Sequence, residues 1–439
     1  MYRKATMALA VAAALGLPHA AAAQTPDELR TLREQVRQLD KRVTEAEQAA
    51  IQASSRPTGE NAMNPAVSVI LNGIYSNLSQ DPNTFRINGF TPTLGDVGPG
   101  VRGFSLGESE LALAANIDHN FRGTLIASIS PEDSIGVEEG YIQTLSLSYG
   151  FTVKAGRFFS AVGYQNQIHA HAWDFTDAPL ANKVFLGNQL NEDGIQLKWV
   201  APTSLYWDVG VEAGRGRQFP AGPAGGRNKN GVSSGNVFTH LGGDLGTGTA
   251  WQTGISYLST SPQDRTFDNL DSSGTPVNTN SFTGNSRLWV LDGILKWAPN
   301  YNPTYTNFKL QGEYFRRKED GNLTFDTTGT PQTGGFTSVQ SGWYLQSVYQ
   351  FVPMWRVGYR YDRLNSGATS FSAPLNAADF PILTAYNPTK HTVMIDWSPS
   401  EFSRVRLQAA SDKSRSDVTD HQVFLQYIVS LGAHGAHKF

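Results

Sequence analysis

The chain has 439 residues, of which 11% are aromatic, 43 are glycine and none is cysteine, and its formal net charge is −3 at pH 7. So small a net charge gives no indication of a nucleic-acid partner. The absence of cysteine excludes cysteine catalysis and thiolate metal sites. No run of about 18 apolar residues occurs beyond the N-terminal region, so we expect no transmembrane helix.

Residues 1–23 have the pattern of a secretory signal peptide. Arg3 and Lys4 precede an apolar run over residues 7–17, and small residues follow at 20–23. This order of a basic, an apolar and a small-residue region is typical of an export signal that is removed from the mature protein. We therefore leave it out of the fold and expect the rest of the chain in the bacterial cell envelope.

Residues 24–50 predict a coiled-coil helix. Thr25 suits the N-cap, Pro26 suits the first helical position, and Glu28 completes a capping box. Apolar residues then recur at the heptad spacing of a coiled coil, at Leu29, Leu32, Val36, Leu39, Val43, Ala46 and Ala50. We expect this helix to associate with copies of itself in the periplasm, and the alternative is a lone amphipathic helix packed on another surface. Residues 51–64, rich in Ser, Pro, Gly and Asn, are predicted to be a linker.

From residue 65 to residue 439 the pattern changes to segments of about ten residues in which polar and apolar residues alternate. We count about 16 such segments, and bacterial outer-membrane barrels have an even number of strands. The last segment is an example, with Val423, Leu425 and Tyr427 on one face and Gln426 on the other. The sequence therefore predicts an all-β fold, a transmembrane antiparallel β-barrel of about 16 strands in the outer membrane.

The connections between these segments alternate between short and long. Residues 118–120 and 201–203 are short turns, whereas residues 77–104, 160–192, 260–285 and 317–338 are long. Outer-membrane barrels have short periplasmic turns and long extracellular loops. The alternation therefore assigns the long connections to the extracellular rim and both ends of the barrel to the periplasm.

Charged residues at alternate strand positions are expected to face the barrel interior. In residues 354–363, Arg356 and Arg360 alternate with Trp355 and Tyr359. A charged side chain at mid-depth costs about 2–4 kcal/mol when it faces lipid, so the inward position is favoured. The predicted pore-lining residues are Glu108, Glu110, Arg122, Lys154, Lys198, Asp208, Lys309, Arg356, Arg360, Arg404 and Arg406. These side chains either tune which solutes pass or are simply solvated and paired across strands.

The long connection 160–192 is predicted to fold into the barrel and narrow it, because it contains many apolar and aromatic residues that are costly to expose. Its predicted constriction residues are His169, His171, Trp173 and Asp174. His169 and His171 lie on one side of an extended stretch and could ligate a divalent cation such as zinc, with Asp174 as the candidate third ligand. The alternative is a pair of hydrogen-bonded loop histidines. His434 and His437 form a second candidate pair near the C-terminus.

No other cofactor or enzyme motif is recognisable in the sequence. An HExxH motif, a phosphate-binding glycine loop and a nucleophile elbow are all absent from it. We therefore expect a protein that is not an enzyme and that has no cofactor other than the candidate zinc.

Several segments resemble a family of proteobacterial outer-membrane proteins. They are residues 106–111, 154–159, 169–175, 424–427 and 430–437. That family is distantly similar to phosphate-selective porins, and its members are often labelled zinc-regulated or TonB-dependent outer-membrane receptors. The resemblance covers residues 65–439 and implies a trimeric porin-like barrel with a link to zinc.

Taken together, these features lead us to expect a passive outer-membrane pore for small hydrophilic or ionic solutes, narrowed by residues 160–192. A first alternative is an outer-membrane receptor or uptake protein linked to zinc or another divalent metal. A second is a non-conducting barrel that tethers the envelope or acts as an adhesin. The expected partners are the lipid bilayer, further copies of the chain with a trimer favoured, and small solutes, but not nucleic acid.

Overall fold

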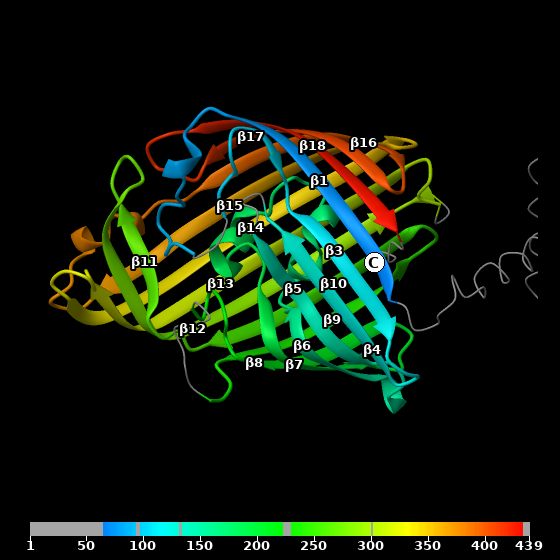
Figure 1. Ribbon diagram of the computed structural model, residues 1–439, viewed down its shortest axis with the longest axis horizontal. Helices are drawn as coiled ribbons and strands as arrows, with labels where there is room; N and C mark the ends of the chain where they lie inside the picture. The colour runs from blue at the N-terminus through cyan, green and yellow to red at the C-terminus, as the bar shows by residue number, and fades with distance from the viewer. Residues whose placement is uncertain (1–64, 94–96, 131–133, 223–229, 300–301, 433–439) are drawn as a thin grey trace, which may run out of the picture. The chain divides into compact units, whose positions relative to one another are not determined.

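The computed structural model describes residues 65–93, 97–130, 134–222, 230–299 and 302–432 (Figure 1). The chain divides into two compact units, Met1–Ala62 and Met63–Phe439. The expected signal peptide, coiled-coil helix and linker lie outside the described residues, as do His434 and His437, so these stay predictions. The second unit is a closed antiparallel β-barrel.

Eighteen strands in the described part of the chain form one sheet that closes on itself. They are β1 (Ala66–Leu78), β2 (Gly103–Leu106), β3 (Ser109–Asn116), β4 (Phe121–Ile129), β5 (Ile135–Thr144), β6 (Phe151–Phe159), β7 (Asn191–Val200), β8 (Tyr206–Gly214), β9 (Ser234–Leu245), β10 (Thr249–Thr260), β11 (Arg265–Leu270), β12 (Pro276–Trp297), β13 (Asn307–Phe325), β14 (Gln332–Val352), β15 (Trp355–Phe371), β16 (Thr389–Ser400), β17 (Ser403–Lys413) and β18 (Asp420–Gly432). The ring closes where β1 pairs with β18, from Ser68 opposite Gly432 to Leu78 opposite Gln422.

The strands make 16 crossings of the barrel wall within the described residues. β2 and β3 both pair with β1 and together form one crossing. β11 pairs with residues 276–282 of β12, whereas β10 pairs with residues 286–297 of the same strand. β11 therefore does not add a separate crossing of the wall. The predicted fold class and the predicted strand number of the barrel are therefore confirmed.

Among the described residues, helical structure is confined to short 3-10 turns and a short α-helix in the connections. The 3-10 turns are η1 (Pro82–Thr84), η2 (Ser148–Gly150), η3 (Gln165–Gln167), η4 (Ala170–Ala172), η6 (Ala377–Asp379) and η7 (Pro381–Leu383), and the α-helix of the described residues is α3 (Leu180–Leu186). α3 ends at Gly187, whose φ of 65° is the left-handed conformation that glycine adopts at a helix C-terminus. In the part of the chain that the structure describes, no helix has the length and apolar character needed to cross a membrane.

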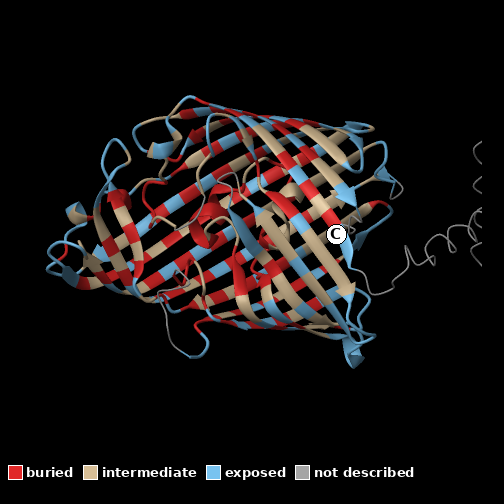
Figure 2. Cartoon of the chain, in the orientation of Figure 1, coloured by how far each residue is buried: buried red, intermediate tan, exposed pale blue. Residues whose placement is uncertain are grey.

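Side chains alternate between the outside and the inside of the barrel along each strand, which gives the strands of Figure 2 their banded colouring. In β17, Leu407 is 48% exposed, whereas Arg406 is 1% exposed and Gln408 is fully buried. In β15, Tyr359 is exposed and Arg360 is buried. The outer face is therefore apolar and the charged side chains point inward, as a barrel surrounded by lipid requires.

The two rims of the barrel differ as predicted. Residues 246–248 join β9 to β10 at one rim, whereas residues 79–102 and 160–190 join strands at the other. Trp355 and Trp397 are exposed beside short turns and stack with ring centroids 6.0 Å apart. Such aromatic residues form the girdle of a barrel at the membrane interface, which agrees with a periplasmic rim at the short turns.

Four strands continue well beyond the expected ends. β12 to β15 contain 22, 19, 21 and 17 residues, whereas about 9–11 residues suffice to cross a bilayer. Much of residues 276–285, 317–325 and 332–338, which we expected as loops, is paired strand instead. The extended ends pack an apolar cluster that includes Phe282 and Phe380. Burial of these aromatic side chains beyond the membrane explains why the sheet continues there.

A hydrophobic core lies inside the barrel around α3. All seven residues of α3 are buried, and Val184 and Phe185 belong to a cluster with Phe315 of β13 and Tyr344 of β14. The rings of Phe185 and Phe315 stack with centroids 5.7 Å apart. Apolar residues of the inward face therefore pack against α3, beside the buried Arg317, which donates to the carbonyl of Val184 at 3.3 Å.

Replacing Leu407 with Arg tests the outer face. Leu407 lies midway along β17 and pairs with Ile395 and Leu425 of the neighbouring strands. We expect the free energy of unfolding in lipid vesicles to fall by about 2–4 kcal/mol, because the arginine would face hydrocarbon at mid-depth. Urea titration of the refolded barrel measures this change. The control Phe402→Arg, at the short turn after β16, should cost only about 0–1 kcal/mol, and equal losses would contradict the assigned depth of Leu407.

Candidate functional site

Residues 160–190, which we call the interior segment, connect β6 to β7 and lie inside the ring of strands (Figure 1). The two ends of this segment meet, because the backbone N–H of Ser160 donates to the carbonyl of Leu190 at 3.0 Å. The side chain of Asn166 donates to the carbonyls of both Ser160 and Leu190, and its oxygen accepts from the N–H of Leu190. The segment is therefore a closed loop that leaves the wall and returns to it at one place.

Buried carboxylates of the wall hold the first part of the interior segment. Oε1 of Glu313 on β13 accepts from the backbone N–H groups of Tyr164 at 2.6 Å and Gln165 at 3.2 Å. Glu212 on β8 accepts from the N–H of Ala161 at 2.8 Å. A carboxylate that is removed from water needs such donors. Both glutamates therefore position the segment, a role that sequence patterns did not reveal.

Two cations of the wall, together with Lys183 of the segment itself, hold the later part of the interior segment. The carboxylate of Asp177 lies 3.0 Å from Arg360, 2.9 Å from Lys390 and 3.6 Å from Lys183. Burial raises the pKa of Asp177, but these three cations outweigh burial and hold its pKa well below the usual value of 3.8. Arg360 also pairs with Asp362 at 2.9 Å. Arg360, a predicted pore-lining residue, is therefore one of the groups that fix the segment.

A second group of cations lies near the rim with short turns. The carboxylate of Asp174 contacts Lys309 and lies 3.5 Å from Arg356. Arg356 also pairs with Asp396 at 2.6 Å. We call Lys309, Arg356, Arg404 and Arg406 the basic cluster. Its four cations outnumber the two carboxylates beside them, so the local charge is positive.

The backbone of the interior segment supplies further partners for the basic cluster. Arg406 donates to the carbonyl of Trp173 at 2.8 Å, and Arg404 donates to the same oxygen at 3.3 Å. Arg404 is only half-buried, and its Nε has no hydrogen-bond partner among the described residues. Trp173 is buried, and its indole N–H donates to the carbonyl of Ile168 at 2.7 Å. Trp173 thus presents its backbone, not its ring nitrogen, to the cations.

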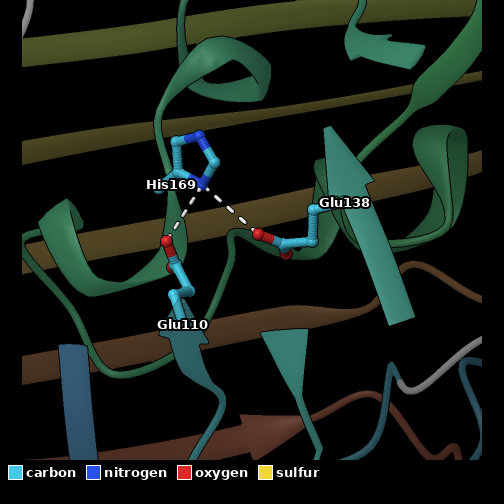
Figure 3. Close-up of side chains that lie close together, drawn as sticks. All are labelled: Glu110, Glu138 and His169. Carbon is cyan, nitrogen blue, oxygen red and sulfur yellow. Dashed lines mark ion pairs between the residues drawn. The ribbon is translucent and has the colours of Figure 1, made fainter. Parts of the chain in front are cut away.

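Glutamates from two strands surround His169 on another part of the wall. Nδ1 of His169 lies 3.3 Å from Oε2 of Glu110 on β3 and 3.3 Å from Oε2 of Glu138 on β5. Figure 3 draws these two ion pairs as dashed lines. Nε2 of the same ring lies 3.1 Å from Oε2 of Glu139. Nδ1 of His171 lies 2.8 Å from Oε1 of Glu110. We call these residues, together with the half-buried Glu108, the His–Glu cluster.

A β-bulge explains how two consecutive glutamates reach this cluster. Ile126 of β4 pairs with Glu139, but Ala127 pairs with Val137, so Glu138 is an extra residue in β5. An extra residue breaks the alternation of a strand and re-aims a side chain. Glu138 therefore turns to the same side as Glu139. Regular alternation along a strand directs only one of two consecutive residues into the interior. Neither Glu138 nor Glu139 was among the predicted pore-lining residues.

The carboxylates also govern the charge of His169. Burial lowers the pKa of this imidazole, but its contacts with Glu110, Glu138 and Glu139 outweigh burial and raise the pKa well above the usual value of 6.5. A cation at this position is therefore strongly favoured by its surroundings. Phe159 packs edge-on against the imidazole, with ring centroids 5.0 Å apart.

The predicted metal ligands are only partly brought together. His169 and His171 do lie side by side, with stacked rings whose centroids are 5.8 Å apart. The candidate third ligand, Asp174, is instead in contact with Lys309 and Arg356. The acidic groups that approach His169 come from β3 and β5, which no local spacing could indicate.

The other predicted pore-lining residues lie elsewhere on the wall. Nζ of Lys154 lies 4.5 Å from the centre of the Tyr141 ring. Asp208 is buried on β8, Lys198 is half-buried on β7, and Arg122 is exposed on β4. The predicted residues are therefore distributed over the wall and do not form a single site.

Replacing Asp177 with Asn tests how charge holds the interior segment. We expect the free energy of unfolding to fall by about 3 kcal/mol at pH 7, because the change leaves buried cations without their carboxylate. The pKa of Asp177 is below its usual value of 3.8, so this contribution is present above about pH 4 and is lost as the pH falls through the lowered pKa. The difference between wild type and variant should therefore shrink in acid, which urea titrations at several pH values measure.

The control for this substitution is Asp417→Asn. Asp417 pairs with Arg86 at 3.1 Å but is 56% exposed, so it should contribute about 0–1 kcal/mol. An Asp177→Asn variant that is no less stable than this control at pH 7 would contradict the assigned role.

No family model matches the chain. A protein of Aquifex aeolicus (strain VF5), named only as an uncharacterized protein, is 33% identical over 355 residues, which are 77% of this chain and 70% of that protein. Two similar solved structures are those of OmpT, an outer membrane protein of Vibrio cholerae. The loop L8 deletion mutant of OmpT has a TM-score of 0.53 and 9% identity, and the match covers 84% of this chain and 100% of that one. In-vitro folded OmpT has a TM-score of 0.50 and 9% identity, with coverage of 86% and 100%.

These likenesses confirm the predicted fold of an outer-membrane barrel and, at 9% identity, concern the fold alone. Their names give no support to the label of a zinc-regulated receptor, which the resemblance in sequence had implied.

Proposed function

Because the chain belongs to the same family as the Aquifex aeolicus protein and has the fold of an outer-membrane β-barrel, we propose that it is a porin-like channel. It admits small hydrophilic or ionic solutes passively across a bacterial outer membrane and, as its sequence resemblance implies, assembles as a trimer. The observation that carries this proposal is the charged interior behind an apolar outer face, as in β17 with Arg406 inside and Leu407 outside. A charged and polar interior gives polar solutes a route that hydrocarbon denies them.

The entrance we propose lies at the rim with long loops. A cavity of about 630 Å³ is present there, bounded by the loop after β1, α3, β11 and the loop before β16. Its lining includes Arg86, Asn88, Lys183, Asp271 and Tyr386. Pockets of about 300–1,000 Å³ accommodate small molecules, and these polar and charged side chains stand among apolar ones such as Phe90, Phe267 and Ile382.

The interior segment is the proposed constriction. It contacts β5 through His169, β13 through Tyr164 and β16 through Asp177, and these strands lie on different sides of the ring. A solute would then pass through the space between this segment and the wall. The basic cluster lies near the periplasmic rim of this path, which favours anions over cations at that point.

Replacing residues 168–186 with a short Gly-Ser linker tests the constriction. We expect the wild-type protein to give stepwise conductance in a planar bilayer, with closures in groups of three for a trimer. The linker variant should conduct several-fold more per step, because the segment that crosses the lumen is gone. Single-channel recording measures both quantities.

The matched control replaces residues 327–330, at the exposed tip of the hairpin between β13 and β14, with the same linker. This change should leave the step size unaltered. Failure of the folded wild-type protein to conduct would overturn the channel, whereas equal steps in wild type and linker variant would overturn only the constriction.

Arg404→Glu tests the role of the basic cluster. This half-buried residue adjoins the carbonyl of Trp173, so reversing its charge should lower the permeability ratio of chloride to potassium about two-fold or more. The reversal potential in a salt gradient measures the ratio. Lys318→Glu, which makes the same change at an exposed position of β13, should leave the ratio as in wild type. Equal shifts in both variants would contradict a role of the basic cluster in selectivity.

A further inference from the structure

The donor atoms of the His–Glu cluster have the spacing of metal ligands. Among the described residues, Glu110, Glu138 and His169 each offer one nitrogen or oxygen atom, and these three atoms all lie within 4.8 Å of one another. Both Oε2 atoms are 3.3 Å from Nδ1 of His169. Ligand atoms about 2.1 Å from a tetrahedral ion lie about 3.4 Å from each other, so a small cation fits between them with little movement.

Two of these atoms lack a hydrogen-bond partner. Nδ1 of His169 and Oε2 of Glu138 are shielded from solvent, and neither has a hydrogen bond of acceptable geometry within the described residues. The same holds for Oε1 of Glu108, whose carboxyl group adjoins that of Glu138. Buried polar atoms are nearly always satisfied, so several that converge on one point indicate a ligand there.

Neighbouring groups fix the orientation of the His169 imidazole that metal binding requires. Oε2 of Glu139 lies 3.1 Å from Nε2 of His169, and Oε1 of Glu139 accepts from the backbone N–H of Phe159 at 3.1 Å. A proton on Nε2 then donates to Glu139 and leaves the lone pair of Nδ1 facing Glu110 and Glu138. A carboxylate behind the imidazole is the usual partner of a metal-bound histidine.

His171 supports the second ligand. Its Nδ1 lies 2.8 Å from Oε1 of Glu110, which leaves Oε2 of that carboxylate directed at His169. The pair His169 and His171 thus divides its roles, with one imidazole facing the donor atoms and the other holding a carboxylate. Three candidate ligand atoms therefore converge here, and two of them have a supporting group behind them.

We infer that the His–Glu cluster binds one divalent first-row transition-metal ion through Nδ1 of His169 and Oε2 of both Glu110 and Glu138. Glu108 or water completes the coordination. One imidazole with carboxylates suits zinc or manganese better than magnesium or calcium, which prefer oxygen ligands alone and higher coordination. The ion would join the interior segment to β3 and β5. This binding does not depend on the proposed channel activity.

Calorimetric titration of the refolded full-length barrel with zinc tests the inference. His434 and His437 are replaced with Ala throughout, so that the C-terminal pair does not contribute a second site. We expect one equivalent of zinc to bind per chain and to raise the midpoint of thermal unfolding, while magnesium at the same concentration does neither. If the protein with His434→Ala and His437→Ala binds no zinc, the proposal is overturned.

Three substitutions test the site. Two of them replace a proposed ligand with a side chain of similar volume, and the third replaces the carboxylate behind the imidazole of His169. His169→Asn and Glu138→Gln should each weaken zinc binding about 100-fold or more. Glu139→Gln should weaken it about 10-fold, because it acts through the imidazole. A difference in gel mobility between unboiled and boiled protein shows that each variant has folded.

The control His391→Asn removes an exposed histidine of β16 and should leave zinc affinity unchanged. Folded His169→Asn and Glu138→Gln variants that still bind one zinc with wild-type affinity would overturn the site. Loss of zinc binding in the folded His169→Asn or Glu138→Gln variant supports the metal site, whether or not that variant still conducts. The metal site and the channel are therefore judged by separate measurements.

Discussion

Closure of the ring by β1 and β18 is the constraint on which the rest of this structure depends. Strands surrounded by lipid find no water for their backbone N–H and C=O groups, so the first and last strands must pair with each other. A closed ring has an outside and an inside, and the energetic cost of facing lipid directs charged side chains inward. The interior charge of this barrel follows from the closure of its sheet.

Charges gathered inside a ring need partners of their own, and the interior segment provides many of them. Glu212 and Glu313 receive backbone N–H groups from this segment, while Asp177 compensates Arg360 and Lys390. The wall and the segment therefore stabilise each other. Several charged residues that sequence patterns placed in the interior are therefore paired with the segment and hold it in place, and the half-buried Arg404 is the better candidate for contact with solutes.

The interior segment is attached to the wall in two chemically different ways. Around Asp177 the attachment consists of buried ion pairs between fixed charges, which persist at neutral pH. Around His169 it consists of carboxylates converging on one imidazole, an arrangement that a proton or a metal ion can complete. If a metal ion occupies that place, the position of the segment beside β3 and β5 depends on metal supply, whereas its position beside β15 and β16 does not.

The sequence by itself determined the parts of the strands that cross the barrel wall, their inward and outward faces and the difference between the rims, because alternation and turn chemistry are local properties. It also identified residues 160–192 as a connection that would enter the barrel. Only the tertiary structure decided what this connection contacts, because its partners are distant in sequence, as Asp177 and Lys390 are at 213 positions apart. Glu138 was missed for a related reason, since the bulge that turns it inward exists only through the register of β5 on β4.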